Sequence, residues 1–161
     1  MTLVPASECF LTRTRPDGRV EVLLGLKKTG VVGRGKIVGP GGHVEPEETD
    51  LEACVREVEE ETGLVVEPED LRAAGVIAFR FPTRPEWDMA VAVFTGERFA
   101  GEPVETDELA PAWHPVDALP FDRMWDDAKH WLPQVLAGGT FNAEITLNDD
   151  CETVFHVEHI A

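Results

Sequence analysis

Residues 42–64, "GHVEPEETDLEACVREVEEETGL", decide the fold, and they hold eight glutamates and one arginine in 23 positions. Residues 49–62 predict a helix, because Thr49 or Asp50 can cap its start and Gly63 can take the left-handed position after its end. On a helical wheel one arc carries Leu51, Cys54, Val55, Val58 and Thr62. We expect this stripe to pack on a β-sheet.

A neighbouring arc of the same helix carries Glu57, Glu60 and Glu61, spaced i, i+3 and i+4, so their carboxylates converge. Like charges at this spacing cost about 0.2–0.5 kcal/mol per pair even when they are exposed. A solvated acidic face is the ordinary interpretation of such a run. A cation site is the alternative, because hard divalent ions prefer carboxylate oxygens and water.

The rest of the chain alternates strand-like and helix-like segments. Strands are predicted at residues 8–14, 19–28, 73–81 and 88–99, a second helix at residues 122–139 with Pro133 kinking or restarting it, and a hairpin at residues 140–159. Residues 29–43 are rich in glycine and predict a loop that approaches another group closely. Strands interleaved with two helices predict an α/β sandwich with a mixed sheet.

The spacing within the acidic stretch matches a family signature. Gly42 is followed after five residues by Glu48, and after seven more by the run from Arg56 to Leu64, "REVEEETGL". This pattern resembles the Nudix hydrolase signature G-x5-E-x7-R-E-U-x-E-E-x-G-U, where U is aliphatic, at every fixed position. The resemblance implies a Nudix-type α/β/α sandwich with a mixed β-sheet, formed by residues 1–161 as a single domain. It also implies an enzyme that cleaves a diphosphate linked to another group.

The resemblance implies a metal site on the predicted helix. Glu57, Glu60 and Glu61 would hold the divalent ions, with the carbonyl oxygen of Gly41 as a further ligand. Mg²⁺ is the expected ion, and Mn²⁺ is possible as a substitute. Crowded carboxylates disfavour one another's ionisation, so one of them can act as a base.

Two further assignments concern residues around that site. The resemblance implies that Arg56 pairs with Glu48 and orients the loop and the helix, whereas the alternative is an exposed i-to-i+4 pair with Glu52 or Glu60. Glu105, in "PVETDEL", is the best candidate for a catalytic base outside the helix. Its alternative is an ordinary exposed loop residue.

The segments "VLLGLKK", "FRF", "GEPVETDEL" and "LPFDRMWDDAKHWLP" resemble the MutT-homologue branch of the family, which hydrolyses oxidised purine nucleoside triphosphates. Aromatic rings can stack on a purine, acids can bind its edge, and a lysine can contact the phosphates or the sugar. The residues assigned to these contacts are Lys27, Phe79, Phe81, Trp125, Asp126 and Asp127. The alternative is that the aromatic residues belong to the core.

The chain departs from that branch at two positions. Val38 stands where the branch has an asparagine that contacts the oxidised base. Alignment also matches Asp127 to the first of two base-reading acids and puts Ala128 at the second. An apolar residue forms no such hydrogen bond, so the preferred base and sugar stay open.

The composition of the chain limits the classes of binding partner that we expect. A formal charge of −17 disfavours a nucleic-acid polymer, which needs a basic surface. The three cysteines form no CxxC pair, which favours free thiols in the cytoplasm. No apolar run approaches the roughly 18 residues needed to span a membrane. We expect a monomer that binds a small nucleotide.

These observations predict Mg²⁺-dependent hydrolysis of oxidised or modified purine nucleoside triphosphates to monophosphate and pyrophosphate, a reaction that cleans the nucleotide pool. One alternative is a Nudix hydrolase of ADP-ribose or dinucleoside polyphosphates. Another is a catalytically silent Nudix module that binds a nucleotide, although this chain retains every carboxylate of the signature.

Overall fold

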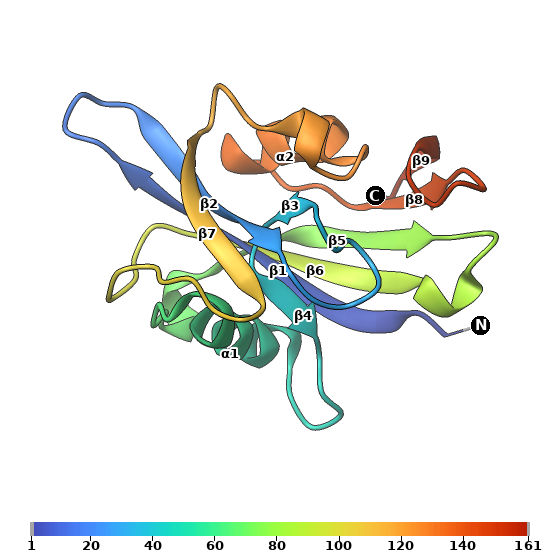
Figure 1. Cartoon of the computed structure of the whole chain (residues 1–161), viewed down its shortest axis with the longest axis horizontal. Helices are drawn as coiled ribbons and strands as arrows, with labels where there is room; N and C mark the ends of the chain where they lie inside the picture. The colour runs from blue at the N-terminus through green and yellow to red at the C-terminus, as the bar shows by residue number, and fades with distance from the viewer. Residues whose placement is uncertain (1, 161) are drawn as a thin grey trace.

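The computed structural model describes residues 2–160, which form a mixed β-sheet with a helix on each side (Figure 1). The strands are β1 (Val4–Thr14), β2 (Val20–Lys27), β3 (Ile37–Val38), β4 (Gly41–His43), β5 (Arg72–Arg80), β6 (Met89–Gly96), β7 (Leu109–Pro115), β8 (Ala143–Leu147) and β9 (Val154–His159). The helices are α1 (Asp50–Thr62) and α2 (Ala128–Leu136), and short 3-10 turns cover Pro68–Asp70, Pro85–Trp87 and Phe121–Arg123.

The strand order is β3-β2-β1-β6-β5-β8-β9, with β4 beside β1 and β7 beside β2. β1 pairs in parallel with β6, and β5 pairs in parallel with β8, while the other pairs are antiparallel. The predicted α/β sandwich with a mixed sheet is therefore confirmed. β1 has three partner strands, because β6 pairs with most of its length, β4 with its first half and β2 with its second half.

The core has one layer on each face of the sheet, and β1 contributes to both by alternation. Phe10 points to the α2 side, where its ring meets Trp131 edge-on with 5.6 Å between ring centroids. Leu11 points to the other side and joins the cluster that contains Val58 of α1. The two helices thus cover opposite faces of one sheet (Figure 1).

α1 begins and ends as predicted. The side chain of Thr49 accepts a hydrogen bond from the Glu52 amide at 3.1 Å, and the Glu52 carboxylate accepts one from the Thr49 amide at 2.9 Å. Gly63 takes the left-handed conformation with φ of 80°. This reciprocal cap fixes the start of the helix that carries the acidic residues.

The second helix is shorter than predicted. α2 begins at Ala128 rather than near residue 122, because Met124 is extended (φ −104°, ψ 172°) and interrupts the chain after a 3-10 turn. Pro133 lies within α2, which continues to Leu136 and does not restart at the proline. Trp125 therefore lies on an irregular segment before the helix.

β7 and the two short strands within residues 29–43 were not predicted. Pro111 and Pro115 made residues 109–115 look unlike a strand in the sequence. Prolines are tolerated in β7 because it is an edge strand, which pairs with β2 alone among the described strands. β3 and β4 hold the glycine-rich segment against β2 and β1. The predicted loop is thus partly built into the sheet.

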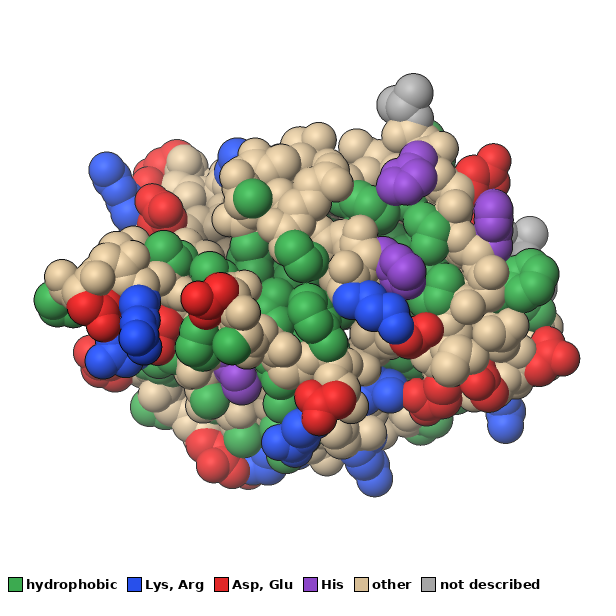
Figure 2. Space-filling view, turned by 90° about the horizontal axis from the view of Figure 1, so that it is seen from above, with side chains coloured by type: hydrophobic (Ala, Val, Ile, Leu, Met, Phe, Trp, Pro, Cys, Tyr) green, Lys and Arg blue, Asp and Glu red, His purple; other side chains and the backbone are tan. Residues whose placement is uncertain are grey.

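The face seen from above carries hydrophobic side chains across its middle and charged side chains mostly towards its rim (Figure 2). Within residues 2–160, neither helix is long and apolar enough to cross a membrane.

Candidate functional site

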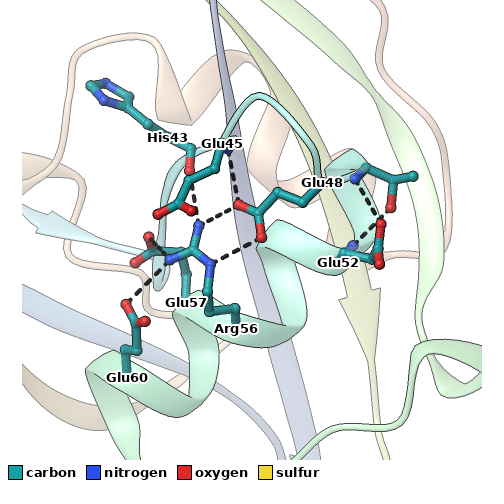
Figure 3. A network of polar contacts seen from close by, with 8 residues as sticks. His43, Glu45, Glu48, Glu52, Arg56, Glu57 and Glu60 are labelled. Carbon is teal, nitrogen blue, oxygen red and sulfur yellow. Dashed lines mark hydrogen bonds and ion pairs between the residues drawn. The ribbon is translucent and has the colours of Figure 1, made fainter.

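Arg56 is the centre of a polar network that joins α1 to the preceding loop (Figure 3). Its Nε donates to Glu48 at 3.0 Å, and its Nη1 donates to Glu57 at 2.7 Å and to Glu60 at 3.3 Å. Its Nη2 donates to the carbonyl oxygen of His43 at 3.2 Å. The pairing of Arg56 with Glu48 lowers the pKa of that carboxyl to about 2.

The predicted Arg56–Glu48 pair is therefore present, and so is the i-to-i+4 pair with Glu60. Glu52 instead takes part in the helix cap. Because Arg56 reaches across eight residues to the loop, it fixes where the glycines of β4 lie relative to the helix.

Gly41 and Gly42 of β4 lie against the acidic face of α1. A Cβ atom at Gly42 would lie 2.7 Å from the carboxylate carbon of Glu57, so a larger side chain there would displace that carboxylate. The amide of Gly41 donates to Glu61 Oε1 at 2.7 Å. Backbone and carboxylates therefore meet in one corner of the structure.

Three carboxylates cluster at that corner. Glu57, Glu61 and Glu108 each offer an oxygen within 4.8 Å of the others. Burial raises the pKa of Glu61 to about 7, although the Gly41 amide opposes the shift, and burial also raises the pKa of Glu57. Partly buried oxygens that resist ionisation on their own fit a hard divalent cation, which would favour their charged forms.

Two predicted residues lie apart from this cluster. Glu60 has 53% of its side chain exposed and is held by Arg56. Glu105 forms an ion pair with Lys28 at 2.7 Å, and Lys28 also donates to the carbonyl of Thr106. Glu108, three residues further on, lies in the carboxylate cluster. The acidic run "ETDE", residues 105–108, indicates in the sequence that an acid from this segment can reach the site. The start of β7 at Leu109 determines which of these acids faces α1.

A cavity of about 550 Å³ extends from this cluster to an aromatic end. Its lining includes Phe79, Phe81 and Trp125, and the rings of Phe81 and Trp125 meet edge-on with centroids 6.1 Å apart. Phe81 is also buried in the core, whereas Phe79 and Trp125 are only half buried. The cavity is of a size typical for small-molecule sites.

The two predicted acids next to Trp125 face different surroundings. Asp127 is buried, lines the cavity and accepts a hydrogen bond from Trp131 Nε1 at 2.7 Å; burial raises its pKa to about 6. Asp126 is not among the lining residues, because its carboxylate accepts from the Val154 amide at 2.8 Å and from Lys129 at 2.9 Å. Of the two acids predicted to read the base edge, the structure places Asp127 in the cavity lining and Asp126 outside it.

Lys27 and Glu8 also line the cavity. Lys27 Nζ donates to the carbonyl of Val32 at 2.8 Å. Glu8 was not predicted; the Gly39 amide donates to its Oε2 at 3.0 Å, and burial raises its pKa to about 8. The sequence feature that could have identified Glu8 is its charge, because it lies between Ala6 and Phe10 on an otherwise apolar strand face.

The Nudix domain family matches residues 5–135, and the chain belongs to this family. An oxidized purine nucleoside triphosphate hydrolase of Danio rerio is 44% identical over 115 residues, covering 71% of both chains. One of Mus musculus is 38% identical over 128 residues, covering 80% of both chains. In fold, the chain resembles a MutT protein from Bacillus halodurans with a TM-score of 0.77, 22% identity and 97% of each chain covered. The predicted class, a Nudix hydrolase, is confirmed.

Proposed function

We propose that this chain hydrolyses oxidised purine nucleoside triphosphates to monophosphate and pyrophosphate with Mg²⁺, and so cleans the nucleotide pool. The observation that carries the proposal is the shared cavity. Acidic groups lie at one end, and aromatic rings with a buried acid lie at the other. The names of the two curated relatives support the same substrate class.

At the acidic end, Glu57 and Glu61 would hold the divalent cation together with Glu108 and the carbonyl of Gly41. Glu60 joins them only if its exposed side chain turns away from Arg56. When bound, the ion neutralises charge that develops on the phosphoryl oxygens. The base that takes a proton from water is one of these carboxylates, and burial raises the pKa of both Glu57 and Glu61, which favours proton uptake.

At the aromatic end, Phe79 and Trp125 present half-buried rings on which a purine can stack. Phe81 supports Trp125 edge-on. Asp127 binds the edge of the base, and Lys27 contacts the phosphates or the sugar between the two ends. Val38 adds only an apolar contact to the lining.

The free thiols support a reducing, cytoplasmic location, since Cys9, Cys54 and Cys151 are all unpaired. In that compartment the enzyme acts as a monomer on a small nucleotide.

A substrate panel tests the function. Ordinary nucleoside triphosphates, 8-oxo and 2-oxo purine triphosphates, ADP-ribose and diadenosine polyphosphates would be incubated with the protein and Mg²⁺ and resolved by chromatography. We expect preferential conversion of an oxidised purine triphosphate to its monophosphate. Preference for ADP-ribose or a dinucleotide would contradict the proposed substrate, and tight nucleotide binding without any turnover would indicate a silent module.

A further inference from the structure

The aromatic end of the cavity receives few hydrogen-bonding side chains from the segment before α2 and from Val38. Ala128, which the resemblance aligns with a second base-reading acid, has no polar side chain, and Asp126 is held outside the cavity by Lys129 and Val154. The segment before α2 therefore contributes one carboxyl group, that of Asp127, to the lining. Val38 adds no hydrogen-bonding side chain.

A second carboxyl group reaches the same cavity from β1. Ala6, Glu8 and Phe10 share the face of β1 that points to α2, by strand alternation. Phe10 contacts Trp131 edge-on, and the indole N–H of Trp131 is bonded to Asp127. Glu8 thus lies on the strand face against which the Asp127 segment packs, and the charge of Asp127 contributes to the raised pKa of Glu8.

The hydrogen bonds of Glu8 leave one of its oxygens available. Oε2 accepts the Gly39 amide at 3.0 Å, which fixes the carboxyl beside Val38. For Oε1 there is no hydrogen-bond partner within residues 2–160, and the side chain is part of the cavity lining. A polar atom in a largely apolar cavity favours a ligand that completes its hydrogen bond.

We propose that Glu8 and Asp127 together bind the hydrogen-bonding edge of the purine, with Glu8 supplying the carboxyl group that Ala128 lacks. The inference rests on the proposed function, because it takes a purine as the occupant of the aromatic end. Glu8 then determines which purine edges are accepted.

Two ligands separate this role from its rivals. 8-oxo-dGMP and 8-oxo-dAMP share the sugar, the phosphate and the C8 oxygen, but they differ in the donors and acceptors of the Watson–Crick edge. Their dissociation constants would be measured by calorimetry in EDTA, so that the metal site takes no part. The decisive quantity is the ratio of the two constants.

The variants are Glu8→Met, which is similar in length but forms no comparable hydrogen bond, and Glu8→Gln, which keeps an oxygen for the Gly39 amide. Glu158→Gln, on exposed β9, is the matched control. We expect Glu8→Met to change the ratio about tenfold, as for loss of one hydrogen bond to a buried polar group, and the control to leave it unchanged. Glu8→Gln, whose amide N–H can replace the O–H of the protonated carboxyl, should stay closer to the wild-type ratio. If Glu8→Met does not fold, Glu8→Ala carries the test.

An unchanged ratio in Glu8→Met, or in Glu8→Ala if Glu8→Met does not fold, would overturn the inference, whether both affinities fall equally or neither falls, because a contact to the sugar or a structural role acts on both ligands alike. Wild-type protein that prefers oxidised purine triphosphates while the variants keep the ratio would remove the Glu8 inference alone. Wild-type protein that neither binds these monophosphates nor hydrolyses the triphosphates would overturn the proposed function as well.

Discussion

The two ends of the cavity are assembled in different ways. The acidic end comes almost entirely from residues 41–61, where β4, its loop and α1 follow one another in the chain, and of the carboxylates within residues 2–160 only Glu108 joins the cluster from elsewhere. The aromatic end combines β1, the segment around Val38, β5 and the residues before α2. A contiguous site has a fixed spacing that a sequence pattern can capture, whereas a dispersed site depends on how the strands pair.

The largest expected effect separates the two ends. Glu61→Gln should reduce turnover of the preferred triphosphate about 10²–10⁴-fold, the range associated with loss of a group that takes part in proton transfer or charge stabilisation. Gln keeps an oxygen for the Gly41 amide, so the fold should persist. Steady-state kinetics measures the loss, and calorimetry in EDTA should show unchanged affinity for the product monophosphate. A parallel loss of affinity would mean that the two ends are not separable.

The next comparison is between two neighbouring acids. Glu108→Gln should lower kcat about 100-fold, because Glu108 lies in the carboxylate cluster. Glu105→Gln removes an exposed ion pair with Lys28, so its kcat should stay within about twofold of wild type. Kinetics on both variants at saturating Mg²⁺ measures the difference. The reverse order of effects would restore Glu105 as the catalytic residue.

At the aromatic end, Trp125→Ala should weaken affinity for an oxidised purine monophosphate about 10- to 100-fold, the range expected for loss of one base-stacking ring. Turnover at saturating substrate should fall less, because the carboxylate cluster is untouched. Fluorescence or calorimetric titration gives the affinity. Trp113→Ala, whose ring packs against Phe99 on the other face, is a control for the loss of a large ring.

The smallest expected effect is a link between pH and metal binding. Burial raises the folded-state pKa of Glu61 to about 7, above its ordinary value, so the protonated form stabilises the metal-free fold at low pH. That contribution is lost as pH rises through about 7. A divalent ion must displace the proton, so added Mg²⁺ should raise the melting temperature more at pH 8 than at pH 6. Thermal unfolding with and without EDTA measures this, and an equal shift at both pH values would contradict it.

The acidic end of the cavity could be predicted from sequence better than the aromatic end. The cap at Thr49, the helix it begins and the Arg56–Glu48 pair were all predicted, because each depends on residues that lie close together in the chain. Glu108 was missed because its position is set by β7, whose prolines hide the strand.

Asp126 and Glu8 show the same limit at the aromatic end. Adjacent acids look equivalent in sequence, but the Val154 amide and Lys129 bind Asp126, and Trp131 binds Asp127. Glu8 lies about 120 residues before Asp127 in the chain, and only the packing of α2 on β1 places both in one cavity. Tertiary contacts, which carry no local pattern, decide these positions.

The most direct test of a cavity with two separate roles is a crystal structure with Mn²⁺ and an oxidised purine monophosphate. We predict anomalous density for Mn²⁺ among Glu57, Glu61 and Glu108, and a purine ring against Phe79 and Trp125. Mn²⁺ bound away from these carboxylates, or a purine bound outside the aromatic end, would contradict the assignment of metal and base to the two ends of one cavity.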